Sequence, residues 1–353
     1  MTGSRTTLVG TPVVAAPGKI FLVGEYAVLD GGVAVLAAVS RYAVAQYLPG
    51  SEPQSRVVDE AVKRSLAAIG EASAALPPGS VLVDTDSFCQ GKVKIGLGSS
   101  AATAVASVGA MFETAGLSIE GMQHEVFSVA EAAHNAAQGG VGSGADVAAA
   151  VWGGFITFTR PAEGPPVIEP IVVPAGLHLV VFWTGESANT RDLVESVQSY
   201  ARLAPSSYRM LMGALRTTAE RFVNELAAGR ATGAVVAAGR YGRQLAELGK
   251  AAGVKIVTDA FERAAALARE LVGQGLNGPG AGHGVGGAAQ MRLLGQDQLG
   301  VAGQSPRPLR RRAERVGEGA QHQRVRAAHG AGEPGHGQTQ QIGPGIDRGQ
   351  HPA

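Results

Sequence analysis

The residues most suited to chemistry form a glycine- and serine-rich segment in front of a run whose pattern predicts a helix. The segment consists of Gly96, Leu97, Gly98, Ser99, Ser100, Ala101 and Ala102. Glycine permits positive φ angles and a close approach of the backbone to a ligand. The first N–H groups of a helix have no partner within the helix, so this arrangement suits a phosphate. Tight packing of a loop on a sheet would use the same glycines, so the segment alone leaves both interpretations open.

Neighbouring side chains favour the phosphate interpretation. Lys94 lies two residues upstream and adds positive charge. The hydroxyls of Ser99 and Ser100 are suited to a phosphate oxygen or to Mg²⁺, and Ser100 is the candidate metal ligand. The segment does not end in Gly-Lys-Ser/Thr, so it is not a P-loop.

Two further segments combine glycine with ionisable residues. The first, APGKIFLVGEYAV at 16–28, contains Lys19 and Glu25, and the second, QGGVGSGADVAAA at 138–150, contains Ser143 and Asp146. A lysine close to an aspartate favours the ionised carboxylate and can stabilise negative charge on a reacting oxygen. Taken alone, Lys19 reads as a strand-edge lysine and Asp146 as an N-terminal helix cap.

The order and spacing of these segments resemble the motifs of the GHMP kinase superfamily. Residues 16–28 resemble its first motif, and residues 96–102 resemble its second, phosphate-binding motif. The segments 138–150 and WTGESANTRDL at 183–193 are similar to phosphomevalonate kinases more than to other members, with mevalonate kinases next. The resemblance extends from about residue 13 to residue 271.

The resemblance implies an α+β, two-domain fold. Residues 12–165 would form an N-terminal ATP-binding domain like the second domain of ribosomal protein S5. Residues 170–274 would form an α+β C-terminal domain, incomplete in this chain, with the site between the two. The elements that would position the motifs are strands at 13–16, 20–23, 41–48, 81–83, 155–158 and 177–183, and helices at 59–76, 101–115, 120–137, 145–151, from Thr190, and over most of 206–272.

The same resemblance implies a reaction and a role for each motif residue. The reaction is ATP-dependent phosphorylation of 5-phosphomevalonate to 5-diphosphomevalonate, with mevalonate as the alternative acceptor and with ATP and Mg²⁺ required. Lys94 and residues 96–102 would hold the triphosphate, and Lys19 and Asp146 would act at the transferred phosphoryl group. The residues implied to face the acceptor are Glu25, Ser143, Thr190 and Arg191. An ionised phosphate acceptor needs cations more than a base, whereas an alcohol acceptor gives Asp146 more weight.

One departure from the mevalonate kinase pattern concerns the metal. Those kinases carry a Mg²⁺-binding glutamate on the helix before the aspartate loop. The matching turn here holds His134 and Asn135, with Glu131 about one turn earlier. The sequence therefore does not identify a second Mg²⁺ ligand.

The sequence changes character at about residue 275. Residues 275–353 contain no Phe, Trp, Tyr or Lys, but five of the eight His and nine Arg, and no apolar period persists. The glycine-rich stretch 278–287, where the third GHMP motif would fall, has no aspartate. Two interpretations follow, a naturally disordered extension and a tail translated out of frame. The missing aspartate and the patternless tail predict little kinase activity, and a divergent but working glycine loop is the alternative. A remnant that only binds nucleotide is the hypothesis from another functional class.

Composition excludes several classes of binding partner. The 353 residues are 45 % hydrophobic and 17 % charged with a formal net charge of +1, so we expect neither a nucleic-acid nor a membrane partner. The start of the chain shows no signal-peptide pattern, and a single cysteine cannot form an internal disulfide. We expect a cytoplasmic protein that acts on a small-molecule substrate, and we allow for a homodimer.

Overall fold

The computed structural model describes residues 11–140, 142–181, 183, 190–276, 290–292 and 310–312. The chain divides into two compact units, residues 1–312 and 313–353. Every element given below belongs to the first unit, and the second lies outside the described residues.

The central sheet is built on two long antiparallel strands, β1 (Val13–Val23) and β2 (Ala34–Pro49). Their residues are mostly β-branched, aromatic or small, which suits a sheet buried on one face. The pairing shifts register between Pro17 and Gly18, immediately before Lys19. Such an irregularity bends a strand and re-aims its side chains. The order is β10-β1-β2-β6-β7, with β3 (Gly79–Asp84) also on β2; the other strands are β6 (Phe155–Thr159), β7 (Val167–Pro170) and β10 (Arg310–Arg312).

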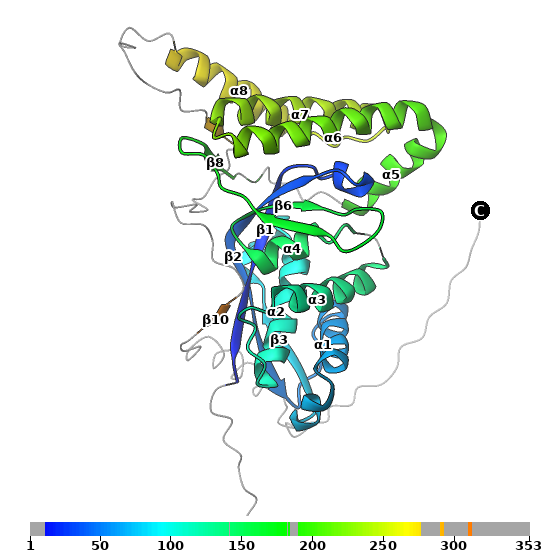
Figure 1. The fold of residues 1–353 in the computed structure, drawn as a ribbon, viewed down its shortest axis with the longest axis vertical. Coiled ribbons are helices and arrows are strands. Elements are labelled where there is room, and N and C mark those ends of the chain that lie inside the picture. The colour runs from blue at the N-terminus through cyan, green and yellow to red at the C-terminus, as the bar shows by residue number, and fades with distance from the viewer. Residues whose placement is uncertain are drawn as a thin grey trace, which may run out of the picture. The chain divides into compact units, whose positions relative to one another are not determined.

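Four helices form the first hydrophobic core with this sheet: three pack on the sheet, and the fourth packs on those three (Figure 1). The three are α1 (Arg56–Ile69), α2 (Ser99–Thr114) and α4 (Ala145–Trp152), and the fourth is α3 (Gln123–Gln138). α2 is central, because its residues from Ala101 to Phe112 are all buried and it contacts β1, β2 and the other three helices. Small residues along α2 and α4 allow this close approach of backbones.

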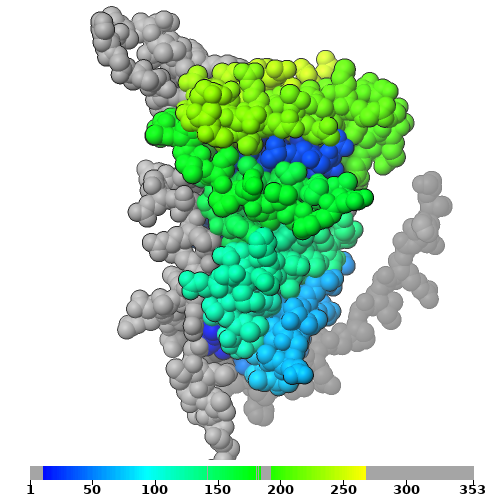
Figure 2. Space-filling model, viewed as in Figure 1, coloured from blue at the N-terminus to red at the C-terminus, as the bar shows by residue number. Residues whose placement is uncertain are grey.

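A second hydrophobic core forms where helices meet the early chain. Its helices are α5 (Thr190–Leu203), α6 (Pro205–Ala227) and α7 (Ala231–Ala251). They bury Met212, Leu215 and Phe222 in one core with Val23 and Tyr26, which lie within the first motif. The α6–α7 pair thus covers the turn that includes the short helix η1 (Ala27–Asp30), as Figures 1 and 2 show for the blue early chain beneath the helices.

The remaining elements are short or lie at the end of the described region. They are η2 (Gly70–Ala75), η3 (Asp86–Phe88), β4 (Cys89–Gln90), β5 (Val93–Lys94), β8 (His178–Val180), α8 (Asp259–Leu276) and β9 (Gln290–Arg292). No helix among the described residues is long and apolar enough to cross a membrane.

Most of the expected elements are confirmed, with three differences. The helical stretch 206–272 is three helices, because Gly229 and Gly253 adopt positive φ and end α6 and α7. Strand β7 was not expected, and it extends the sheet beyond residue 165. The three-residue strands β9 and β10 pair with β8 and β1, inside a segment for which no strand was expected. The other residues of the predicted tail, with the stretch 278–287, lie outside the described residues, and the domain boundaries stay predictions.

Candidate active site

The glycine-rich segment forms a tight turn that opens helix α2, as its pattern predicts. Gly96 and Gly98 have φ angles of 78° and 76°, a region that favours glycine. Gly98 is the N-cap and supplies no side chain to the first-turn N–H groups. The first hydrogen bond of the helix runs from the Ala102 N–H to the Gly98 carbonyl oxygen, at 3.1 Å. The amides that precede Ala102 and the positive end of the dipole therefore face the open end of the helix.

Some side chains of this turn are buried, and others are partly exposed to solvent. Leu97, Ala101 and Ala102 are buried and anchor the turn in the first core. Ser99 and Ser100 are half-buried, and within the described part of the chain neither hydroxyl has a hydrogen-bond partner. Lys94 lies exposed on β5, upstream of the turn. The two hydroxyls are thus free to bind a ligand.

Lys19 lies directly against the turn. Its backbone N–H donates to the Leu97 carbonyl oxygen at 2.9 Å. A Cβ atom added to Gly98 would lie 2.9 Å from Lys19 Cε, so the lysine stem covers this glycine. The ammonium nitrogen lies 4.9 Å from the centroid of the Phe21 ring. A cation therefore stands beside the open amides, which reinforces an anion site.

The loop that contains Ser143 and Asp146 is held by an ion pair between Arg160 and Glu131. Arg160, just after β6, donates from Nε to the Ser143 carbonyl oxygen at 2.8 Å and from Nη2 to Glu131 on α3. Gly144 packs so closely on this pair that an added side chain would overlap the Glu131 carboxylate. Arg160 and Glu131 thus fix the loop that leads into α4.

Asp146 stands in the first turn of α4 and is not its N-cap. The N-cap is Gly144, whereas the Asp146 Oδ1 accepts from the Val147 N–H at 3.0 Å. The Ser143 hydroxyl accepts from the Ala145 N–H at 3.3 Å. Asp146 therefore stabilises the helix start through one oxygen, and its other oxygen is available to a ligand.

The structure gives Glu131 and His134 structural partners. Burial raises the pKa of Glu131; the Arg160 guanidinium opposes this, and the nearby Asp146 carboxylate adds to it. His134 is buried, and its Nε2 lies 2.8 Å from Gln138 Nε2. Among the described residues, no group of three or more His, Cys, Asp or Glu could hold a metal ion by itself. A metal here would need phosphate oxygens as further ligands.

Glu25 occupies the turn between the two cores. Its Oε2 atom is buried and has no hydrogen-bond partner in the described structure, whereas the residue as a whole is half-buried. Burial raises the pKa of Glu25 to about 7, and its own backbone N–H and the Lys19 ammonium act in the opposite direction. Lys19 is therefore close enough to Glu25 to influence its charge.

The predicted site residues are only partly brought together. Lys19 joins the turn at 96–102 to Glu25, but no ion pair links it to Asp146 among the residues that the structure describes. Thr190 and Arg191 begin α5, and their side chains, like residues 184–189 before them, lie outside the described part. The catalytic and binding roles of all these residues stay predictions.

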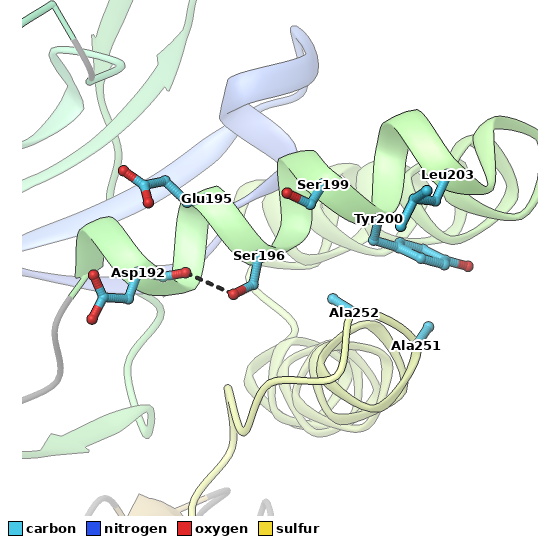
Figure 3. A pocket seen from close by; sticks show the side chains of 8 residues that line it. All are labelled: Asp192, Glu195, Ser196, Ser199, Tyr200, Leu203, Ala251 and Ala252. Carbon is cyan, nitrogen blue, oxygen red and sulfur yellow. Dashed lines mark hydrogen bonds between the residues drawn. The ribbon is translucent and has the colours of Figure 1, made fainter.

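A hollow with a volume of about 440 Å³ lies away from these residues, between α5 and the end of α7 (Figure 3). Its lining is formed by Asp192, Glu195, Ser196, Ser199, Tyr200, Leu203, Ala251 and Ala252. This lining contains no basic side chain and no predicted site residue. A triphosphate needs cations or open amides, so this hollow does not suit a nucleotide.

Sequence reasoning missed Arg160, which shapes the site, and gave no role to Tyr241, which belongs to the second core. Arg160 follows an ordinary strand, and only the structure shows that it reaches the Ser143 loop. Tyr241 lies in the middle of α7, where an aromatic residue at helical spacing indicates a core position, and it is buried. Neither has a local sequence signal, because both act on segments far away along the chain.

Comparison with known proteins finds small-molecule kinases among the relatives of this chain. Residues 58–154 match the family model described as GHMP kinases N terminal domain. A phosphomevalonate kinase of a Streptomyces strain is 29 % identical, with 80 % of this chain and 89 % of that protein covered. A mevalonate kinase of Aeropyrum pernix is 34 % identical over 53 % of this chain and 61 % of its own length.

A solved structure shares the fold. The phosphomevalonate kinase of Streptococcus pneumoniae, in complex with phosphomevalonate and AMPPNP, superimposes with a TM-score of 0.53 and 20 % identity, covering 67 % of this chain and 80 % of that one. Residues 58–154 therefore resemble the N-terminal domain of the GHMP kinases, which are ATP-dependent small-molecule kinases, and the chain shares the fold of this solved structure. Its curated relatives are kinases of phosphomevalonate and of mevalonate.

Proposed function

We propose that the chain transfers the γ-phosphoryl group of ATP to 5-phosphomevalonate. The observation that carries the proposal is the open N-terminus of α2, with the free hydroxyls of Ser99 and Ser100 and with Lys19 against Gly98. The choice of acceptor is supported by the phosphomevalonate kinase that matches along 89 % of its length. Mevalonate is the alternative acceptor, because mevalonate kinases match over a shorter span.

The turn at 96–102 would hold the triphosphate. Positive φ at Gly96 and Gly98 shapes the turn, and the first N–H groups of α2 have no side-chain cap, so they suit phosphate oxygens. Lys19 and Lys94 would supply positive charge from β1 and β5. Phosphoryl transfer depends mainly on positioning and on neutralising charge, and these groups provide both.

The acceptor would lie between Lys19, Glu25 and the Ser143–Asp146 loop. In the transfer, an acceptor phosphate oxygen forms a bond to the γ-phosphorus, and the bond to the β–γ bridging oxygen breaks. The electron pair of that bond stays on ADP. Lys19 would stabilise the added negative charge, as would Arg191 from the start of α5. With mevalonate the nucleophile is a hydroxyl, and Asp146 would take its proton.

The residues present fit Mg²⁺ only together with bound phosphates. Mg²⁺ prefers oxygen ligands and retains several waters, so Ser100 and Asp146 could each contribute one oxygen. When bound, Mg²⁺ would neutralise charge on the β- and γ-phosphates. Glu131 is already paired with Arg160 and does not fit a ligand role.

A coupled assay of ADP release tests the proposal. ADP should form in the presence of 5-phosphomevalonate, more slowly with mevalonate, and at background rate with neither acceptor. Equal, acceptor-independent rates in all three reactions would overturn the proposed activity. Preference for mevalonate would replace the acceptor but retain the class of reaction.

A catalytically impaired kinase that only binds nucleotide is the second candidate. It is favoured by the absence of an aspartate from 278–287 and of Lys and aromatic residues from 275–353. A ligand that binds only the folded state raises the melting temperature. A rise of melting temperature with ATP, combined with no ADP release on either acceptor, would select this candidate. The coding DNA at codons 272–285, read in all three frames, would test the frameshift interpretation directly.

A further inference from the structure

Arg160 directly follows β6, and its guanidinium group connects two other parts of the chain. Its Nε donates to the Ser143 carbonyl oxygen at 2.8 Å, and its Nη2 pairs with the Glu131 carboxylate on α3. The guanidinium carbon also lies 5.7 Å from the centroid of the ring of Phe158, a fully buried residue. A guanidinium is planar, so contacts from two of its nitrogens and from a ring together fix its orientation. Arg160 is therefore held with its Nε directed at the loop before α4.

The loop before α4 has little stiffness of its own. Residues 142–144 read Gly-Ser-Gly, and glycine has the greatest backbone freedom of all residues. Gly144 adopts a φ of 82°, and a Cβ atom added there would overlap the Glu131 carboxylate and lie 2.9 Å from Arg160 Nη2. The loop backbone thus packs directly on the ion pair, which supplies the constraint that the glycines do not.

The same contact acts on the two side chains that the proposed function places beside the acceptor. Ser143 supplies the carbonyl oxygen that Arg160 holds, and its hydroxyl accepts from the Ala145 N–H at 3.3 Å. Asp146 follows three residues later, in the first turn of α4. A change of direction at the Ser143 carbonyl would therefore move the serine hydroxyl and the start of the helix that carries Asp146.

The ion pair contributes less to the stability of the whole fold. The Arg160 and Glu131 side chains are 35 % and 16 % exposed, and solvent weakens ion pairs that it reaches. Helix α4 is already fixed by its buried residues, which include Val147–Val151. The main effect of the pair is therefore local order in the loop.

We propose that Arg160 is a positioning residue for the acceptor, because it holds the loop that carries Ser143 and leads to Asp146. Its effect on acceptor binding rests on the proposed function, whereas its hold on the loop does not. The planar guanidinium is the required feature. A lysine ammonium could still pair with Glu131, but it could not keep both contacts in the same directions.

Amide hydrogen exchange of the intact chain tests the hold on the loop without any turnover. Arg160→Gln should speed exchange at residues 143–147 at least about tenfold, as expected for the loss of a hydrogen bond from a charged group, and should leave α1 unchanged. Arg160→Lys should speed the same amides, because charge alone does not replace the planar group. Wild-type exchange at 143–147 in either variant would overturn the proposal.

Arg230→Gln is the matched control for this measurement. It breaks a comparable ion pair where α6 meets α7, in which Arg230 Nε lies 2.7 Å from Glu225 Oε2. Exchange at 143–147 should stay at the wild-type rate in this variant. An acceleration equal to that of Arg160→Gln would overturn the proposal, because it would assign the effect to a general loss of stability.

Steady-state kinetics then connect Arg160 to the acceptor. In an active enzyme, Arg160→Lys should raise the acceptor KM severalfold and leave the ATP KM unchanged, because Lys19 and the turn at 96–102 keep their contacts. An unchanged acceptor KM, or an equal rise of both KM values, would overturn the positioning role.

Calorimetric titration with 5-phosphomevalonate and with ATP applies the same comparison to a chain that does not turn over. A wild-type chain without acceptor-dependent ADP release would count against the proposed function alone, because exchange and titration would still decide the role of Arg160.

Discussion

At the scale of single residues, the unusual group is Glu25. A carboxyl group normally titrates near pH 4.5, but burial raises the pKa of Glu25 to about 7. The Lys19 ammonium moderates this shift and ties the charge of the turn to the proposed phosphate site. A carboxyl that titrates near neutral pH is unusual for a surface group and is frequent at functional sites.

The first prediction concerns stability and pH. Because the folded pKa exceeds the unfolded value of 4.5, the folded chain retains a proton between pH 4.5 and 7 that the unfolded chain releases. Stability should therefore fall as the pH rises through this window and level off above pH 7. Glu25→Gln should remove this pH dependence, which changes the free energy of unfolding by up to about 3 kcal/mol across the window. Urea unfolding at pH 5 and pH 8 measures it, and an unchanged slope would contradict the buried carboxyl.

The second prediction separates catalysis from helix capping at Asp146. Asp146→Asn keeps an oxygen that can accept from the Val147 N–H but removes the charge. If Asp146 acts at the phosphoryl group, kcat should fall at least about tenfold, equivalent to about 1.4 kcal/mol, with little change of unfolding free energy. Lys19→Met should lower kcat in the same way. A variant that loses mainly melting temperature would assign Asp146 to the helix alone.

At the scale of elements, helix α2 connects the fold to the proposed chemistry. Its buried middle fixes it against β1 and β2, so its N-terminus is held rigidly beside Lys19. A Cβ atom at Gly98 would press on the Lys19 side chain, which would have to shift. A side chain at Gly98 would therefore displace the cation that stands beside the proposed anion site.

The third prediction compares the two ends of this helix. Gly98 and Gly116 have φ angles of 76° and 82°, so alanine costs roughly 1–2 kcal/mol of strain at either. An added Cβ meets Lys19 Cε at 2.9 Å at Gly98 and nothing within 4 Å at Gly116. Calorimetric titration with ATP should therefore show at least tenfold weaker binding for Gly98→Ala and normal binding for Gly116→Ala. Equal ATP affinities of the two variants would show that the turn at Gly98 does not bind the nucleotide.

The elements were largely predictable from local patterns, and the contacts between them were not. The glycines around Ser99 and the apolar run after it predicted α2, and α4 followed from its alanines. The Arg160–Glu131 pair joins residues 29 positions apart, and no periodicity signals it. Tyr241 on α7 shares the second core with Tyr26 of the first motif, and this arrangement depends on how that core closes. Long-range packing of this kind is set by tertiary structure.

At the scale of the described molecule, the turn after β1 contributes residues to both hydrophobic cores. The first core lies between the sheet and α1–α4, and the second lies between α5–α7 and the residues around the first motif. Val23, Tyr26 and Val35 belong to the second core although β1 and β2 build the first sheet. Arg216 on α6 adds a hydrogen bond to the Asp30 carbonyl oxygen at 3.2 Å. The helices therefore stabilise the turn that holds Glu25.

The last prediction tests this dependence with one truncation in each core. Phe222 on α6 is fully buried in the second core, and Phe127 on α3 is buried in the first, against Trp152. Each change to alanine should lower the unfolding free energy by about 3–5 kcal/mol, because it removes apolar contacts and leaves a cavity. Native-state hydrogen exchange should distinguish them: Phe222→Ala should speed exchange of the amides at 24–30 far more than of those in α1, and Phe127→Ala should do the reverse. The same variant, Phe222→Ala, should raise the acceptor KM through a loosened Glu25, whereas Phe127→Ala should not. Equal exchange at 24–30 in both variants would show that the turn is held by the sheet alone.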